Sequence, residues 1–156
     1  MEQTAERLTI ERTVEIEATP ETVWGLLVDP ELAKRWWGLD AKLDPEPGGE
    51  FMVRIHPGRT ARGVFVEVDE PRRLVYTFGW ELTGELPPSP IAPGSTTVEI
   101  TLEPSGGGTT LTFVHRGLVD QEAFESHSMG WDHYLSRLAT VAAGGDPGPD
   151  PWAQQS

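Results

Sequence analysis

The chain has 156 residues, the usual size of one domain, and this length allows a core to form without disulfides. It contains no cysteine, which excludes disulfides and cysteine metal sites, and a cytoplasmic location is expected. The net charge of -13 disfavours binding to nucleic acid. The N-terminus lacks a signal-peptide pattern, and no apolar run approaches the ~20 residues needed for membrane insertion.

The first predicted elements are a strand and two short helices. Residues 1–7 are expected to form an N-terminal extension, and residues 8–17 alternate apolar and polar side chains, as a strand with one buried face does. Thr19 and Asp29 each precede a Pro-Glu pair, which is typical of a capped helix start. The sequence therefore predicts two helices in tandem after the first strand.

A run of strands follows a turn at residues 45–49. Apolar alternation predicts strands at 51–55, 63–68, 74–80, 98–102 and 111–115. Residues 84–95 contain four prolines, which cannot donate ladder hydrogen bonds, so this segment is expected to project as a stiff spacer rather than as a docking peptide.

The last predicted element is a long amphipathic helix. Asp120 is placed to cap a helix over residues 121–141, whose apolar stripe reaches across a whole sheet. Residues 144–156 are rich in Gly, Pro and Asp and are expected to form a disordered tail. The predicted fold class is α+β, with a domain over residues 8–143 in which a curved antiparallel sheet of about six or seven strands wraps the long helix.

Several short motifs in this order resemble the START-like (SRPBCC) helix-grip superfamily, and within it the C-terminal domain of the activator of heat-shock protein 90 ATPase. They are ATPETVW at 18–24, DPELAKRWWG at 29–38, PGGEF at 47–51, PRRLVYTF at 71–78, LTFVH at 111–115 and GW at 130–131. The resemblance implies the helix-grip fold. It also implies membership of a group that includes lipid carriers, hormone binders, polyketide cyclases and chaperone-associated proteins of the stress response.

The predicted function is binding of a small apolar or aromatic molecule in a cavity between the sheet and the long helix. The predicted lining residues occupy inward positions of strands or helices: Trp36, Phe51, Val53, Tyr76, Phe78, Trp80, Ile100, Phe113, His115, Phe124, His127, Trp131 and Leu135. A solid core filled by the same side chains is the competing interpretation, and the cavity is preferred because the resembling fold usually leaves one.

Two other functions stay open at this level. A cyclase or dehydratase would use the same cavity, with His115 or Tyr76 as acid or base. A chaperone-associated protein would bind a partner through its acidic surface, and a homodimer could form at an exposed sheet edge. No cofactor is expected, and the scattered histidines, including His127 and His133 about 120° apart on the helix, argue against a metal site.

Overall fold

The computed structural model describes residues 8–56, 58–82 and 91–150. The predicted N-terminal extension, positions 84–90 of the Pro-rich segment and positions 151–156 of the predicted tail lie outside the described residues. The described elements, in chain order, are β1 (Leu8–Ile16), α1 (Pro20–Val28), α2 (Pro30–Ala33), β2 (Asp40–Leu43), β3 (Glu50–His56), β4 (Arg59–Asp69), β5 (Arg73–Phe78), β6 (Trp80–Leu82), β7 (Thr96–Ser105), β8 (Gly108–Leu118) and α3 (Gln121–Ala142).

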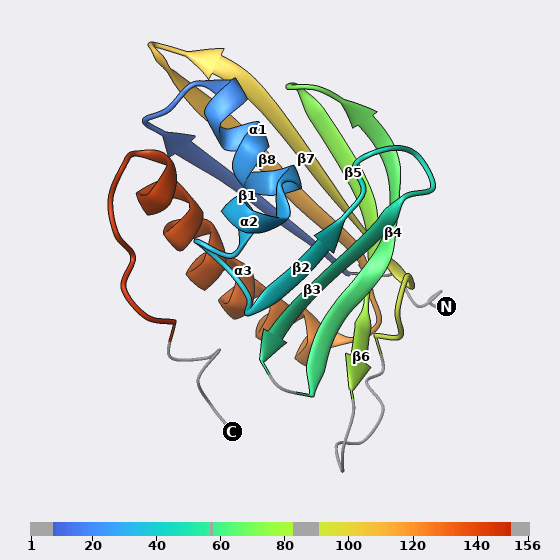
Figure 1. The fold of residues 1–156 in the computed structure, drawn as a ribbon. Helices are drawn as coiled ribbons and strands as arrows, with labels where there is room; N and C mark the ends of the chain where they lie inside the picture. Colours follow the sequence, from blue (N-terminus) through green and yellow to red (C-terminus); the bar gives the residue numbers. More distant parts are fainter. Residues whose placement is uncertain (1–7, 57, 83–90, 151–156) are drawn as a thin grey trace, which may run out of the picture.

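The strands form one antiparallel sheet in the order β1-β8-β7-β5-β4-β3-β2, with β6 paired to β4. The sheet curls around α3, and α1 and α2 lie on the same side of it as α3 (Figure 1). This confirms the predicted α+β helix-grip fold. Among the described residues, no helix combines the length and the apolar character that a membrane crossing needs.

The three helix starts are capped as predicted. The Asp120 carboxylate accepts a 2.8 Å hydrogen bond from the Ala123 backbone N–H, and Asp29 accepts one of 2.9 Å from that of Glu31. Thr19 accepts from the backbone of Thr22 at 3.3 Å. Each cap satisfies a backbone donor that the helix leaves unpaired, which explains why these short signals were sufficient.

The sheet has two strands that apolar alternation did not predict. β2 is short and pairs along β3, and its residues lack a run of apolar side chains. The predicted strand over 74–80 is interrupted at Gly79, where a Cβ would collide with the Ala92 carbonyl. Trp80 resumes as the start of β6, with its backbone N–H donating to Ile91 at 2.8 Å. Close backbone approach, which only glycine permits, therefore redirects the chain here.

The segment after α3 also differs from the expectation. Residues 144–150 were expected to be disordered, yet Asp150 is buried against α3, where it accepts hydrogen bonds from Tyr134 and pairs with His133. Arg137 donates to the backbone carbonyls of Pro147 and Gly148. The expectation of disorder was based on the low apolar content of this segment. Hydrogen bonds to α3 hold the segment instead.

Candidate functional site

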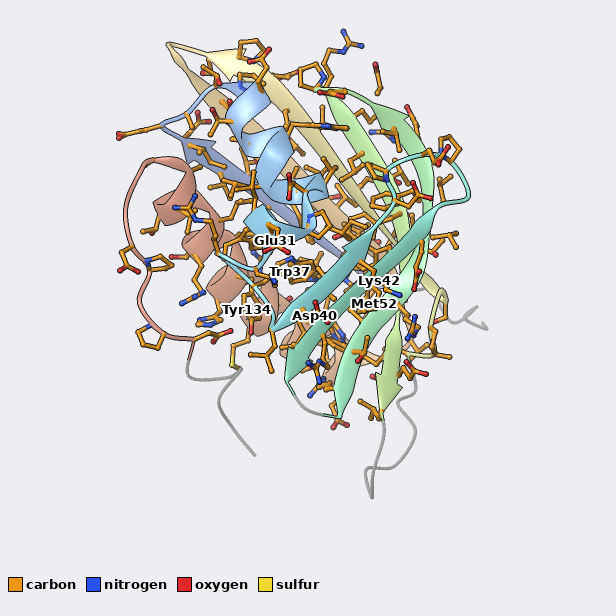
Figure 2. All side chains as sticks on the ribbon, viewed as in Figure 1. Glu31, Trp37, Asp40, Lys42, Met52 and Tyr134 are labelled. Atoms are coloured by element: carbon orange, nitrogen blue, oxygen red, sulfur yellow. The ribbon has the colours of Figure 1, made fainter. Side chains whose placement is uncertain are left out.

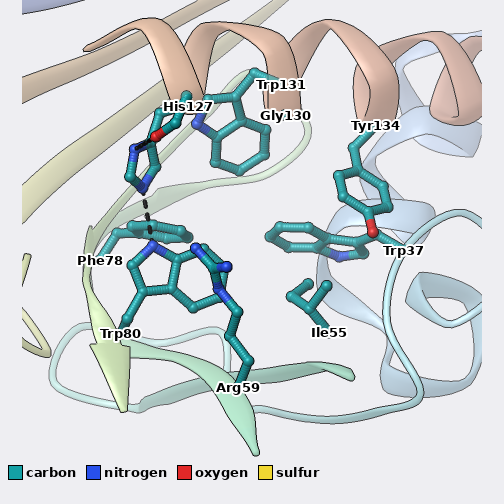
Figure 3. Close-up of a pocket in the computed structure, with 10 residues that line it drawn as sticks. Trp37, Ile55, Arg59, Phe78, Trp80, His127, Gly130, Trp131 and Tyr134 are labelled. Carbon is teal, nitrogen blue, oxygen red and sulfur yellow. Dashed lines mark hydrogen bonds between the residues drawn. The ribbon is translucent and has the colours of Figure 1, made fainter. Parts of the chain in front are cut away.

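A pocket of about 250 Å³ lies between the N-terminal half of α3 and the strands that face it (Figure 3). Its walls come from α3, from strands β3 to β6, and from Trp37, which lies just after the turn that follows α2. The lining residues are Trp37, Ile55, Arg59, Phe78, Trp80, Ser126, His127, Gly130, Trp131 and Tyr134. The pocket is therefore built where the curl of the sheet leaves space beneath the helix.

Aromatic rings form most of the pocket wall. The ring of Trp131 lies 5.3 Å from that of Trp37 and 5.7 Å from that of Phe78, centroid to centroid. Phe78 in turn meets Trp80 edge to face at 5.3 Å. Figure 2 shows Trp37 and Tyr134 close together beside α3, and their centroids are 6.1 Å apart. Such a wall presents ring faces and edges suited to another flat apolar molecule.

Trp37 lines the pocket, whereas Trp36 was the predicted lining residue. The two rings stack at 4.7 Å, and Trp36 lies outside the lining set, with its indole N–H donating to the Leu26 carbonyl at 2.8 Å. Both side chains are buried. The anchoring hydrogen bond of Trp36 decides which ring faces the pocket.

The α3 wall follows helical spacing. His127, Gly130, Trp131 and Tyr134 are separated by three, one and three residues, so they fall on one face of the helix. Gly130 adds no side chain to this face, beside three larger neighbours that also line the pocket (Figure 3). The predicted lining residues included Trp131 and His127, and the same spacing extended by one turn indicates Tyr134.

His127 lines the pocket with both ring nitrogens engaged. The Ala123 carbonyl can only accept, so Nδ1–H donates to it at 2.8 Å, and Nε2 accepts from the Trp80 indole N–H at 2.8 Å. These bonds define a neutral imidazole. Burial lowers the pKa of His127, and the charge of Arg59 acts in the same direction. His127 therefore holds Trp80 in place in its neutral form.

His115 lies behind the pocket wall rather than in it. The hydroxyl of Thr96 donates to the Phe78 carbonyl at 2.7 Å, so it accepts from His115 Nε2–H at 2.8 Å. Nδ1 of His115 accepts from the Trp131 indole N–H at 3.0 Å. Burial, and secondarily the neighbouring His127, lowers the pKa of His115 to about 3. The ring is thus fully bonded, and it supports Trp131 directly and Phe78 through Thr96.

The buried neutral state of His115 predicts a dependence of stability on pH. Between pH 6.5 and about 3, His115 is protonated in the unfolded chain but stays neutral in the folded chain. The free energy of unfolding therefore falls as the pH falls through this range. The expected slope from this ring is about 1.4 kcal/mol per pH unit in the middle of that range. Urea denaturation at several pH values measures the free energy of unfolding. Its slope against pH should be steeper for the wild type than for His115→Gln, which has no titrating group at this position, by this amount. Imidazole ¹⁵N signals that report a pKa near 6.5 for this ring would contradict the assignment.

The remaining predicted lining residues belong to the packed core or its edge. Phe124 is partly buried against the core, and outside the pocket wall lie Phe51, Val53, Tyr76, Ile100, Phe113 and Leu135. Tyr76 stacks on Phe51 at 4.1 Å, and burial raises the pKa of its phenol. The inward alternation of the strands is confirmed, but the interior is solid under most of the sheet and hollow at one end.

Arg59, the first residue of β4, is the charged member of the wall and was not a predicted site residue. Its guanidinium carbon lies 4.4 Å from the centroid of the Trp80 ring, in a cation–π contact. Burial lowers the pKa of Arg59, and its Nε is buried without a hydrogen-bond partner among the described residues. Nothing in the local sequence pattern around Arg59 indicated that it would face the interior.

Among the described residues, no group of three or more His, Asp or Glu side chains could hold a metal ion.

Comparisons with known proteins place this geometry in a family. The model of the family described as "Activator of Hsp90 ATPase homolog 1-like protein" matches residues 17–143. An AHSA1-like protein from Rhizobium etli, solved by NMR, is 44% identical over 100% of this chain and 95% of its own, with a TM-score of 0.74. No curated protein matches.

Two less similar structures share the fold. A protein in the dynemicin biosynthetic locus is 22% identical, with a TM-score of 0.76 over 94% of this chain and 51% of its own. The Aha1 dimer from Colwellia psychrerythraea is 21% identical, with a TM-score of 0.72 over 88% of this chain and 98% of its own.

Proposed function

Because this chain belongs to the Activator of Hsp90 ATPase homolog 1-like family, whose fold it shares, we propose that it binds a small aromatic molecule in the pocket beneath α3. The observation that carries the proposal is the wall itself. Five aromatic side chains, those of Trp37, Phe78, Trp80, Trp131 and Tyr134, surround an unfilled volume. Apolar pockets with a few placed polar groups are the usual form of small-molecule sites.

The volume sets the size of the ligand. About 250 Å³ lies just below the roughly 300–1,000 Å³ typical of sites for drug-sized molecules. One or two fused rings fit such a space, whereas a long lipid chain does not.

The pocket supports a binder better than an acid–base enzyme. A general acid or base must reach the substrate, and the two predicted candidates, His115 and Tyr76, are both outside the pocket wall. His127 reaches it with both nitrogens already bonded. The chaperone-associated function, a protein partner and a homodimer stay predictions. The outer strands of the described sheet, β1 and β2, are where a second chain would pair.

A neutral two-ring probe tests the proposal. With 1-naphthalenemethanol we expect the indole N–H signals of Trp37, Trp80 and Trp131 to shift in a ¹H–¹⁵N titration, because ring currents act on groups that line the pocket. The indole of Trp24, buried in α1 outside the wall, should not move and serves as the internal control. At about 0.4–0.5 kcal/mol per non-hydrogen atom, the expected Kd is on the order of 0.1 mM. Unchanged indole signals at millimolar probe would remove the support for a ligand site.

A further inference from the structure

We propose, building on the function proposed above, that the ligand of this pocket is an aromatic carboxylate and that Arg59 binds its carboxylate group. The proposal names the chemical class of the ligand and the residue that selects it. It rests on the position, burial and bonding of a single guanidinium group in an otherwise apolar wall (Figure 3).

Arg59 lacks the partner that its burial requires. No carboxylate oxygen of the described residues lies within 4 Å of its guanidinium nitrogens, and its buried Nε donates no hydrogen bond to any of them. Arg59 as a whole is half-buried, and even partial burial of a cation without a counter-charge is costly, so proteins usually pair such groups. A ligand anion in the pocket would supply both the missing charge and the missing acceptor.

The other arginines make this unusual within the same chain. With 25 acidic and 12 basic residues, carboxylate partners are abundant. Five arginines have such partners: the pairs are Arg12 with Asp132, Arg62 with Glu50 and Glu81, Arg72 with Asp69, Arg73 with Glu67 and Glu99, and Arg116 with Glu99. Arg35, Arg54 and Arg137 also lack a carboxylate partner among the described residues, but Arg35 and Arg54 are exposed, and Arg137 donates to three backbone carbonyls. Among the described arginines, only Arg59 has a buried nitrogen without a hydrogen-bond partner.

The geometry of the guanidinium favours a planar carboxylate. The cation–π contact with Trp80 uses the face of the guanidinium and leaves its edge, where the N–H groups lie, available to a ligand. Nε–H and one Nη–H point the same way and match the two oxygens of a carboxylate in a bidentate pair. The rings of Trp37, Phe78 and Trp131 then provide the surface for the aromatic body of the same molecule.

The surroundings argue against a more highly charged anion. Arg59 also borders a smaller pocket that is lined by Asp120 and Glu122. The carboxylate oxygens of these two residues do not lie within 4 Å of the Arg59 guanidinium nitrogens. These two acidic side chains, and the overall charge of -13, repel a dianion such as phosphate more than a monoanion. A single carboxylate on an apolar ring is the anion that this wall accommodates.

The test compares two probes of nearly equal shape, 1-naphthoic acid and the neutral 1-naphthalenemethanol, by NMR titration at pH 7, where the acid is ionised. The wild type should bind the carboxylate at least about 10-fold more tightly. Arg59→Gln should lose this preference while it keeps its affinity for the alcohol. Arg54→Gln is the matched control, because it removes the same charge from an exposed arginine on the neighbouring strand and should retain the preference.

The outcomes separate the inference from the function on which it rests. If the wild type binds both probes equally, or if Arg59→Gln keeps the preference, the carboxylate assignment is overturned and the aromatic pocket stands. If neither probe binds to any variant, both proposals fall. Arg59→Lys keeps the positive charge but cannot form two parallel hydrogen bonds to a carboxylate. It should show a reduced preference for 1-naphthoic acid over the alcohol, and so it tests the bidentate geometry.

Discussion

Replacing Trp131 with alanine is expected to lower the free energy of unfolding by about 3–5 kcal/mol. Trp131 is buried at the centre of the molecule, where its ring contacts Trp37, Phe78 and Phe113, the last at 4.5 Å. Its loss enlarges the pocket into a cavity that these rings cannot fill. It also leaves His115 Nδ1 without its only donor in the described structure. Urea denaturation at pH 7 measures the effect.

Two variants of the same helix separate packing from hydrogen bonding. Trp131→Phe keeps most of the ring contacts but removes the indole N–H, and we expect it to cost about 1–3 kcal/mol. Met129→Ala changes a side chain that is 63% exposed on the opposite face of α3 and should stay within about 0.5 kcal/mol of wild type. A Trp131→Ala loss no larger than that of Met129→Ala would mean that the ring is not part of the core.

Replacing Gly130 with leucine is expected to abolish binding of 1-naphthalenemethanol, with at least a 100-fold rise in Kd, while the fold is retained. Gly130 lies on the face of α3 that carries His127, Trp131 and Tyr134, so its new side chain must project into the pocket. Leucine also favours a helix interior over glycine by about 0.8 kcal/mol, which offsets strain from the added atoms. The same NMR titration gives the affinity, and thermal unfolding gives the stability.

Gly130→Ala is the control for this change. Its single methyl group should raise helix stability by about 1 kcal/mol and leave room for the probe, so that Kd changes by less than about 10-fold. If Gly130→Leu folds and still binds the probe with wild-type affinity, the ligand site is not the pocket beneath α3. Stability lost in both variants would instead indicate that glycine is required by the backbone at this position.

The pocket wall both packs against the core and faces the pocket. Trp131 contacts the core through Phe113 and bonds to His115, and on its other side it faces the pocket. His127 likewise bonds to the backbone of α3 and orients Trp80, over which Arg59 lies. Two rings of the wall, those of Trp131 and Trp80, are therefore each held in place by a hydrogen bond to a histidine.

The elements that the sequence predicted correctly depend on local rules. Caps at Thr19, Asp29 and Asp120 are contacts within three residues, and strand alternation is a property of consecutive positions. The long helix and the family motifs extend over enough residues to specify the helix-grip fold. β2 and the break at Gly79 were missed because they depend on pairing with distant backbone, which leaves no periodic signal.

The amino-acid sequence by itself determined the helix-grip fold, the direction in which most core side chains point, and the Phe78, Trp80, His127 and Trp131 part of the pocket wall. Only the tertiary structure decided which inward positions border empty space, because packing closes the interior around Phe51 and Tyr76 and leaves it open beneath Gly130. Arg59 is part of the wall for a similar reason. The pairing of β4 with β6 places it against Trp80, and residues near Arg59 in the sequence give no indication of this contact.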